Sequence, residues 1–207
     1  TYQAAFTESS PVSTFNSGNQ ILLNASGSLQ IDNRILTYMN NQWKAENEFS
    51  WSDLTGKTNV TAVYPVYPDL DYVQENLYKN NSLEDILYVK DEFPAGNSIH
   101  LQFKHLFSLL TLHLEGNLQT YFQKIEVTCP AVSSIIPKSA EIVLADNGTH
   151  TTTIAQVSPS GNYSFIVPPV GNMVIAINMV TNGKKYTTQL ETKSFTCLLY
   201  TSPSPRD

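Results

Sequence analysis

Short segments rich in β-branched and aromatic residues recur along the chain, and turn-forming residues separate them. No helical periodicity lasts beyond about ten residues. The best short helix is Asp69–Tyr78, which follows Pro68, and Ser82 with Asp85 offers a cap for one more turn. The sequence therefore predicts an all-β fold. The predicted strands are Gln20–Asn24, Ile35–Met39, Asn59–Tyr64, Ile99–His105, Leu109–Glu115, Lys124–Cys129, Glu141–Ala145, Thr151–Val157, Tyr163–Val167, Met173–Val180 and Lys185–Leu190.

Two short polar sequences predict tight turns between these strands. Asn182-Gly183 separates the last two segments, and Asn-Gly takes positive φ at both central positions without difficulty. We therefore expect a β-hairpin there. Asp146-Asn147-Gly148 predicts a similar turn between Ala145 and Thr151.

The apolar alternation changes face within Ile99–Glu115. Successive side chains of a strand point to opposite faces. One apolar set is odd-numbered and the next is even-numbered: first Ile99, Leu101, Phe103, Phe107 and Leu109, then Leu110, Leu112 and Leu114. A straight strand would expose one of these sets, so we predict a β-bulge or a crossing between sheets near Ser108–Leu110. Either solution favours a β-sandwich over a flat sheet.

Composition and charge limit the classes of partner. Charged residues make up 14% of the chain, below the usual quarter, and the net charge is −6. An acidic chain without Lys/Arg clusters argues against nucleic acid as a partner. No apolar run approaches the ~20 residues that a membrane-spanning helix needs. Any link to a membrane must therefore come from a lipid or from a segment before Thr1.

The last residues, Cys197–Asp207, read CLLYTSPSPRD. Back-translated, they reproduce an adapter used in DNA library preparation, so we interpret 197–207 as a non-native tail and exclude it from fold reasoning. A Ser/Pro-rich natural linker is the alternative. We expect the natural protein to continue beyond Thr196, and Thr1 to be a mature or truncated end. Cys129 is then the single native cysteine, and we interpret it as a buried structural thiol rather than a nucleophile.

No catalytic motif is present. The sequence lacks G-x-S-x-G, HExxH, P-loop and GxGxxG patterns. Paired carboxylates of the glycosidase type meet only in space, and nothing in the sequence points to them. We therefore expect a protein that is not an enzyme, with no catalytic residue, no cofactor-binding residue and no metal ligand.

Three histidines and three acidic residues are candidate metal ligands. On one extended strand His105 and His113 would lie about 26 Å apart at ~3.3 Å per residue, and His100 would face away from His105. We interpret His105 as structural. Asp69-x-Asp71 with Glu75 offers oxygens for Ca²⁺, but the EF-hand spacing and its glycine are absent, so we predict a solvated loop.

Aromatic residues gather in the first half of the chain. They either cap a small β core or, if exposed, stack on sugars; the set is Tyr38, Trp43, Trp51, Tyr64, Tyr67 and Tyr72. Several asparagines begin N-x-S/T sequences, and we interpret them as Asn-rich turns; they are Asn24, Asn59, Asn80, Asn147 and Asn162.

Four motifs in order resemble the fimbrillin-like family, whose members are surface lipoproteins and pilus subunits of anaerobic Gram-negative bacteria. The family places a Trp before an AYYP-type strand, then DLLYA, then F-x-H-x-L-S-x-L. Here these places hold Trp51, Ala62-Val63-Tyr64-Pro65, Asp85-Ile86-Leu87-Tyr88 and Phe103–Leu109.

The resemblance implies two transthyretin-like β-sandwich domains, both incomplete. Pro94 and Gly96 break the strand pattern within Asp91–Asn97, so we predict a first domain over 1–93, lacking its start, and a second over 94–196, lacking its last strands. We also expect an unfilled strand position in the second domain. Its predicted core is Leu101, Phe103, Leu110, Leu112, Leu114, Ile125, Val127, Ile142, Leu144, Phe165, Val167, Val174, Ala176 and Tyr186.

The function implied by the resemblance is that of a non-enzymatic cell-surface fimbrial subunit or adhesin. Its partners would be other pilus subunits, joined by β-strand exchange, and a glycan or protein on a host or bacterial surface. Outer-membrane anchoring would require a lipid on a cysteine before Thr1. The alternative is a carbohydrate-binding surface lipoprotein of a glycan-uptake system. An exposed aromatic platform would favour that alternative, and buried aromatics would favour the pilus subunit.

Overall fold

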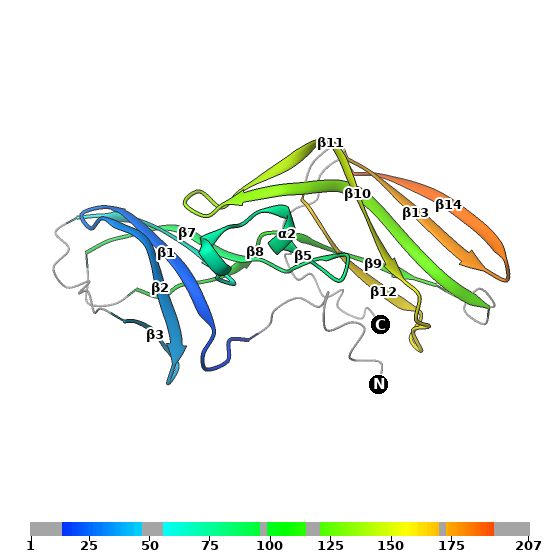
Figure 1. Ribbon diagram of the computed structural model, residues 1–207. Helices are drawn as coiled ribbons and strands as arrows, with labels where there is room; N and C mark the ends of the chain where they lie inside the picture. The colour runs from blue at the N-terminus through cyan, green and yellow to red at the C-terminus, as the bar shows by residue number, and fades with distance from the viewer. Residues whose placement is uncertain (1–13, 47–55, 96–98, 115–120, 170–172, 193–207) are drawn as a thin grey trace, which may run out of the picture.

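A computed structural model describes residues 14–46, 56–95, 99–114, 121–169 and 173–192 (Figure 1). In these residues antiparallel sheets dominate and helix is confined to single turns, so the predicted all-β class is confirmed. Paired sheets around apolar clusters agree with the predicted β-sandwich architecture. None of the helices in the described residues is long and apolar enough to cross a membrane.

The first half of the chain forms a six-stranded sheet in the order β3-β2-β1-β4-β7-β8. The side chains of β1 alternate: Ile21 and Leu23 enter one apolar cluster, and Leu22 enters another on the opposite face. Both faces of this sheet are therefore covered in part, which explains why β1 reads as a nearly continuous apolar run. The strands are β1 (Gln20–Gly27), β2 (Ile31–Met39), β3 (Gln42–Ala45), β4 (Thr58–Tyr64), β7 (Leu87–Phe93) and β8 (Lys104–His105).

A polar insert between β4 and β7 contains short elements only. They are the 3-10 turn η2 (Pro68–Leu70), the single turn α2 (Gln74–Leu77), and the small hairpin of β5 (Tyr78–Lys79) and β6 (Ser82–Leu83). The predicted helix over Asp69–Tyr78 is therefore correct only for the single turn Gln74–Leu77, and the predicted cap at Ser82 is wrong because Ser82 begins β6. Asp69 takes a left-handed φ of 55° and Asp71 is extended. Packing of Tyr72, which is 2% exposed, overrides the weak local helical preference.

The second half is a sandwich of unequal sheets. A four-stranded sheet, β11-β10-β13-β14, faces the two-stranded sheet β12-β9. Between them lies a cluster built on Ile125, Val127, Tyr163 and Phe165, in which Phe122 stacks on Tyr163 with ring centroids 4.8 Å apart. The strands are β9 (Ser108–His113), β10 (Phe122–Ile136), β11 (Glu141–Ile154), β12 (Asn162–Val167), β13 (Met173–Thr181) and β14 (Lys184–Thr192).

One of the two predicted turns exists. Asn182 and Gly183 both have positive φ, 47° and 69°, and join β13 to β14, as predicted. The predicted turn at Asp146-Asn147-Gly148 is wrong, because β11 runs through it. The register shifts there: Pro130 faces Thr149, and Val132 faces Leu144. The extra residues bulge out of β11 beside Pro130, which has no N–H to donate to the ladder.

The change of apolar face is a crossing between sheets, as predicted. β8 pairs with β7 in the first sheet, whereas β9 pairs with β12 in the second. Between them Leu106 and Phe107 are buried, at 4% and 0% exposed. The boundary between residues 93 and 94 stays a prediction, since β8 still pairs with the first sheet.

The predicted core of the second domain is correct in part. Leu110, Ile125, Val127, Phe165 and Val167 are buried in the second sandwich. Leu101 and Phe103 were assigned wrongly, because they pack partly buried against the first sheet's cluster instead. Tyr186 is also wrong, at 47% exposed. Leu112 and Leu114 are partly buried beside the cluster of the second sandwich. Ile142 and Leu144 are partly buried beside a cluster that also contains Leu22 and Val63 of the first sheet. Ala176 is partly exposed, and the side chain of Val174 lies outside the described residues.

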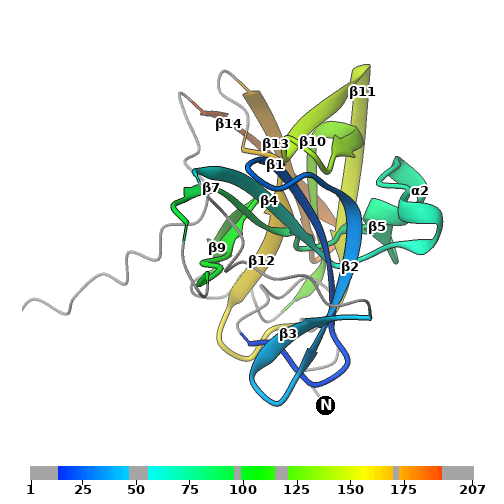
Figure 2. The same ribbon diagram turned by 90° about the vertical axis from the view of Figure 1, so that its left-hand side faces the viewer.

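A shared apolar cluster joins the two halves. It combines Leu22 and Val63 of the first sheet with Val132 and Ile135 of β10 and with side chains of the insert. Figures 1 and 2 show the β10–β11 hairpin extending over the insert toward the first sheet. The backbone N–H of Ile135 donates to the carbonyl of Tyr72 at 2.9 Å, which fixes the hairpin to the insert.

Candidate functional site

Three of the four sequence motifs lie on adjacent strands. Tyr64 at the end of β4 pairs with Leu87 of β7, and Leu87 pairs with His105 of β8. The backbone N–H of Leu106 then donates to the carbonyl of Ile86 at 2.7 Å. The motifs are therefore neighbours in one sheet, although about forty residues separate the first from the last in the sequence. Trp51 lies outside the described residues.

His105 has a structural partner in this arrangement. Its Nδ1–H donates to the carboxylate of Asp85, with N–O distances of 2.8 and 3.0 Å. The side chains are 16% and 3% exposed, respectively. A buried carboxylate needs such a partner. The interpretation of His105 as structural therefore has a direct physical explanation, and sequence analysis missed only its partner.

The other candidates for metal binding are dispersed. His100 is exposed, and His113 is hydrogen-bonded to Asn162 Oδ1 at 2.7 Å. Asp69, Asp71 and Glu75 are exposed on the insert. Among the described residues, no group of three or more His, Cys, Asp or Glu side chains is arranged to hold a metal ion.

Cys129 is buried in the second sandwich at 7% exposed. Burial raises the pKa of its thiol to about 11. The thiolate is the reactive form, so a thiol of this kind is a poor nucleophile at neutral pH. The interpretation as a structural cysteine agrees with this environment.

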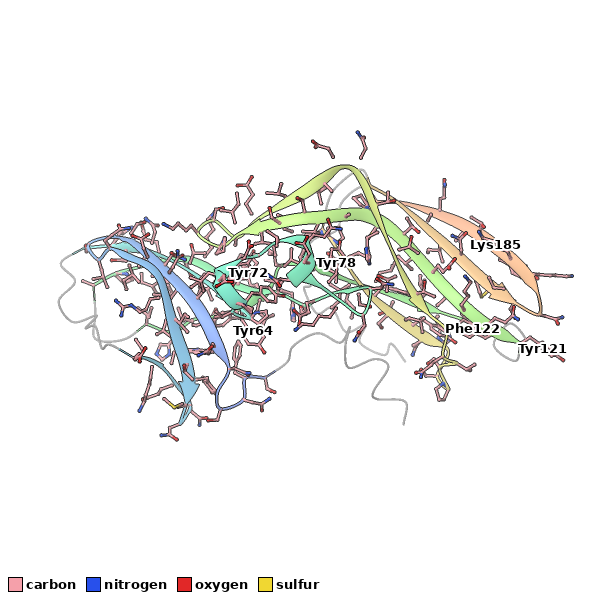
Figure 3. All side chains as sticks on the ribbon, viewed as in Figure 1. Tyr64, Tyr72, Tyr78, Tyr121, Phe122 and Lys185 are labelled. Carbon is pink, nitrogen blue, oxygen red and sulfur yellow. The ribbon has the colours of Figure 1, made fainter. Side chains whose placement is uncertain are left out.

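The aromatic residues of the first half pack inward. Tyr67 and Tyr72 are buried at 6% and 2% exposed, and the Tyr72 hydroxyl donates to the Pro65 carbonyl at 2.7 Å. Trp43 meets the ring of Phe15 edge-on, with centroids 5.0 Å apart. Figure 3 shows Tyr64 and Tyr72 in the middle part of the molecule, among other side chains. Tyr67 and Tyr72 therefore lie in an apolar core, and Trp43 and Tyr64 pack partly buried against another, which is the arrangement that favours the pilus-subunit interpretation.

The turn interpretation of the N-x-S/T asparagines is correct only in part. Asn80 has a positive φ in the turn between β5 and β6. The turn interpretation is wrong for the other four, Asn24, Asn59, Asn147 and Asn162, because they lie in β1, β4, β11 and β12.

The open side of the second sandwich carries an apolar groove. Among the described strands, β9 pairs with β12 alone and β14 pairs with β13 alone. Because β14 extends the larger sheet beyond the smaller one, a groove of about 230 Å³ lies between β9 and β14. Most of the surface that lines the groove is apolar. The lining residues are Leu112, His113, Leu114, Ile125, Ile177, Met179, Tyr186, Thr187 and Thr188.

Among the strands that the structure describes, β14 is an edge strand beside this groove. Lys184–Gln189 are all exposed. Tyr186 and Thr188 lie opposite Met179 and Ile177, so their side chains share the face that lines the groove. In a two-residue hairpin the residues flanking the turn exchange both hydrogen bonds, so alternate residues of β14, such as Lys185 and Thr187, direct N–H and C=O outward. Figure 3 shows Lys185 on this outer strand.

Comparison with known proteins supports the resemblance stated above. No protein with a curated description matches the chain. A solved structure of a candidate cell adhesion protein from Bacteroides uniformis is similar in fold, with a TM-score of 0.62, 12% identity, and coverage of 88% of this chain and 83% of the other. A fimbrial protein from Bacteroides ovatus gives a TM-score of 0.47 and 16% identity over 88% of this chain and 42% of the other. The fimbrillin-like family model matches residues 5–199, and the chain therefore belongs to the fimbrillin-like family.

Proposed function

We propose that this chain is a non-enzymatic cell-surface subunit of a fimbria, or an adhesin related to such subunits, and that it accepts a β-strand from another subunit in the groove between β9 and β14. Family membership supports the fimbrial role. The single observation that carries the strand-exchange step is this apolar groove beside the open edge of β14.

The groove has the two properties that strand addition requires. The outward N–H and C=O groups of β14 offer a ladder for a new strand, and main-chain hydrogen bonds supply affinity in such complexes. The partly exposed Leu112, Leu114 and Tyr186 offer apolar surface that an incoming side chain would bury. The partner is therefore an extended segment with apolar residues at alternate positions.

The remaining parts of the proposal concern organisation and location. We propose transthyretin-like sandwich domains over 1–93 and 94–196, placement on the cell surface, and attachment to the outer membrane through a lipid. Among the described residues, the inward-packed aromatics of the first half support this role over that of a glycan-uptake lipoprotein.

Site-specific crosslinking tests strand exchange. A photoreactive phenylalanine analogue at Tyr186 faces the groove, and the same analogue at Lys185 occupies the neighbouring position on the opposite face of β14. In the bacterium that carries the gene, we expect the analogue at 186 to crosslink to a terminal segment of another subunit, and the control at 185 to give far less product. Equal crosslinking from both positions, or none from 186 in assembled fimbriae, would refute the proposal.

A further inference from the structure

A second cavity lies far from the groove, between the first sheet and the turn of the β10–β11 hairpin. It has a volume of about 460 Å³, within the range typical of small-molecule pockets. Figure 1 shows this hairpin turn above the region of β7. Lys138, in the turn, contributes one wall, and β1, β2, β4 and β7 with Gln30 between β1 and β2 contribute the rest.

The floor of the cavity is made of two polar rows that cross three strands. Ser26 of β1 pairs with Asn59 of β4, which pairs with Glu92 of β7. The next row begins with Asn24, which pairs with Thr61, and Thr61 pairs with Lys90. Paired residues share one face of a sheet, so these six side chains all lie on the face beneath the hairpin.

One ion pair and two hydrogen bonds lie at the rim of the cavity. Lys138 Nζ lies 2.6 Å from Asp32 Oδ1, and Gln30 Nε2 donates to Asp32 Oδ2 at 3.2 Å. Lys90 Nζ donates to the carbonyl of Ser139 at 3.4 Å. These contacts join the hairpin to the rim of the first sheet and leave the polar floor between them open.

Asn24 is the feature that points to a ligand. It is 6% exposed, lines the cavity, and its Oδ1 accepts a hydrogen bond from the backbone N–H of Asn33 at 2.9 Å. Its Nδ2 is buried and has no hydrogen-bond acceptor among the residues that the structure describes. Buried polar groups are nearly always paired, so this donor indicates a position for an acceptor atom supplied from the cavity.

The chemistry of the lining limits the class of ligand. The lining carries three acidic and two basic side chains, so its charges nearly cancel; they are Asp32, Asp91, Glu92, Lys90 and Lys138. Asp32 and both lysines already have partners, which disfavours a phosphate or a divalent cation. Amide and hydroxyl groups from Asn24, Gln30, Asn59, Ser26 and Thr61 supply both donors and acceptors at close spacing.

We propose that this cavity binds a neutral saccharide, whose hydroxyl groups donate and accept in turn. One hydroxyl oxygen would accept from Asn24 Nδ2. The site is independent of the strand-accepting groove, so either proposal can fail without the other. A surface subunit carrying both features would join its neighbours through one half and contact a glycan through the other.

Solution NMR on the full chain tests the proposal directly. The probes are neutral hexoses, N-acetylhexosamines and their disaccharides, with inorganic phosphate and Ca²⁺ as the other ligand chemistries. We expect at least one saccharide to bind with a dissociation constant on the order of 1 mM or tighter, and to shift the side-chain amide resonance of Asn24. Binding of phosphate or Ca²⁺ in place of every saccharide would overturn the proposal.

Matched variants separate this site from adventitious binding. Asn59→Ala removes an exposed amide from the floor, and Asn162→Ala removes an exposed amide from β12, outside the cavity. We expect at least tenfold weaker saccharide binding for Asn59→Ala and unchanged binding for Asn162→Ala, with both variants retaining the parent's thermal midpoint. Equal affinity in the two variants, or a complete absence of saccharide binding, would refute the assignment.

Discussion

Replacing Phe107 and Phe103 separately with alanine tests how the chain crosses between sheets. Both positions are odd-numbered in one apolar pattern, so a straight strand would bury the two rings alike. The structure separates them. Phe107 is 0% exposed in the cluster shared by the two halves. Phe103 lies partly buried at the margin of the first cluster, with its ring centroid 5.0 Å from that of Phe15.

The expected costs differ because the environments differ. Truncating a fully buried phenylalanine loses its transfer free energy and leaves a cavity, so we expect Phe107→Ala to cost about 3–5 kcal/mol. Phe103→Ala loses part of the hydrophobic transfer free energy of the ring, which is about 1.5–3 kcal/mol for full burial. It also loses an aromatic contact worth about 0.5–1.5 kcal/mol. Solvent reaches this position already and little cavity remains, so we expect a cost of roughly 1–2.5 kcal/mol for Phe103→Ala.

Urea unfolding followed by circular dichroism measures both free energies. The slopes of the transitions should match that of the parent chain, so that differences in midpoint report stability alone. The reasoning would be refuted if Phe103→Ala destabilised the protein as much as Phe107→Ala or more. That result would restore the straight-strand interpretation of Ile99–His105.

Three further predictions concern buried polar and ionisable groups. Asp85→Ala should cost about 1.5–3 kcal/mol in urea unfolding, because it removes the hydrogen bond between the His105 ring and a buried carboxylate; a cost below about 1 kcal/mol would contradict a structural role for the pair. The Cys129 thiol should react with a thiol reagent at pH 8 only as the protein unfolds, since burial raises its pKa to about 11; rapid labelling of folded protein would disagree. Burial, with the hydrogen bond to Glu84, raises the pKa of Tyr67 above its ordinary value, so this residue's contribution to stability is complete below about pH 10 and is lost as pH rises further. Tyr67→Phe should therefore reduce the loss of stability measured by urea unfolding between pH 9 and pH 11, and an unchanged pH dependence would count against this assignment.

Local sequence patterns predicted the features that depend on neighbouring residues. The Asn182-Gly183 hairpin follows from the ability of both residues to take positive φ, and no distant contact is needed. The crossing after β8 follows from the change of apolar parity, because a straight strand would expose one of the two apolar sets to water. The turn predicted at Asp146-Asn147-Gly148 is wrong because it depends on a contact with a neighbouring strand. Its local chemistry allows a hairpin, but Pro130 on the neighbouring strand makes it a bulge.

The sequence alone determined the all-β class, the order of the motifs and the absence of catalytic sequence motifs. Each of these depends only on residue types and on their spacing along the chain. Tertiary structure decided which strands became neighbours. It placed Asp85 against His105, made β4, β7 and β8 adjacent, and left β14 overhanging a smaller sheet. It also placed Lys138 against Asp32 at the rim of the polar cavity that Asn24 lines. These contacts join residues far apart in sequence, and a side-chain period reports only the face of a strand, never the strand beside it.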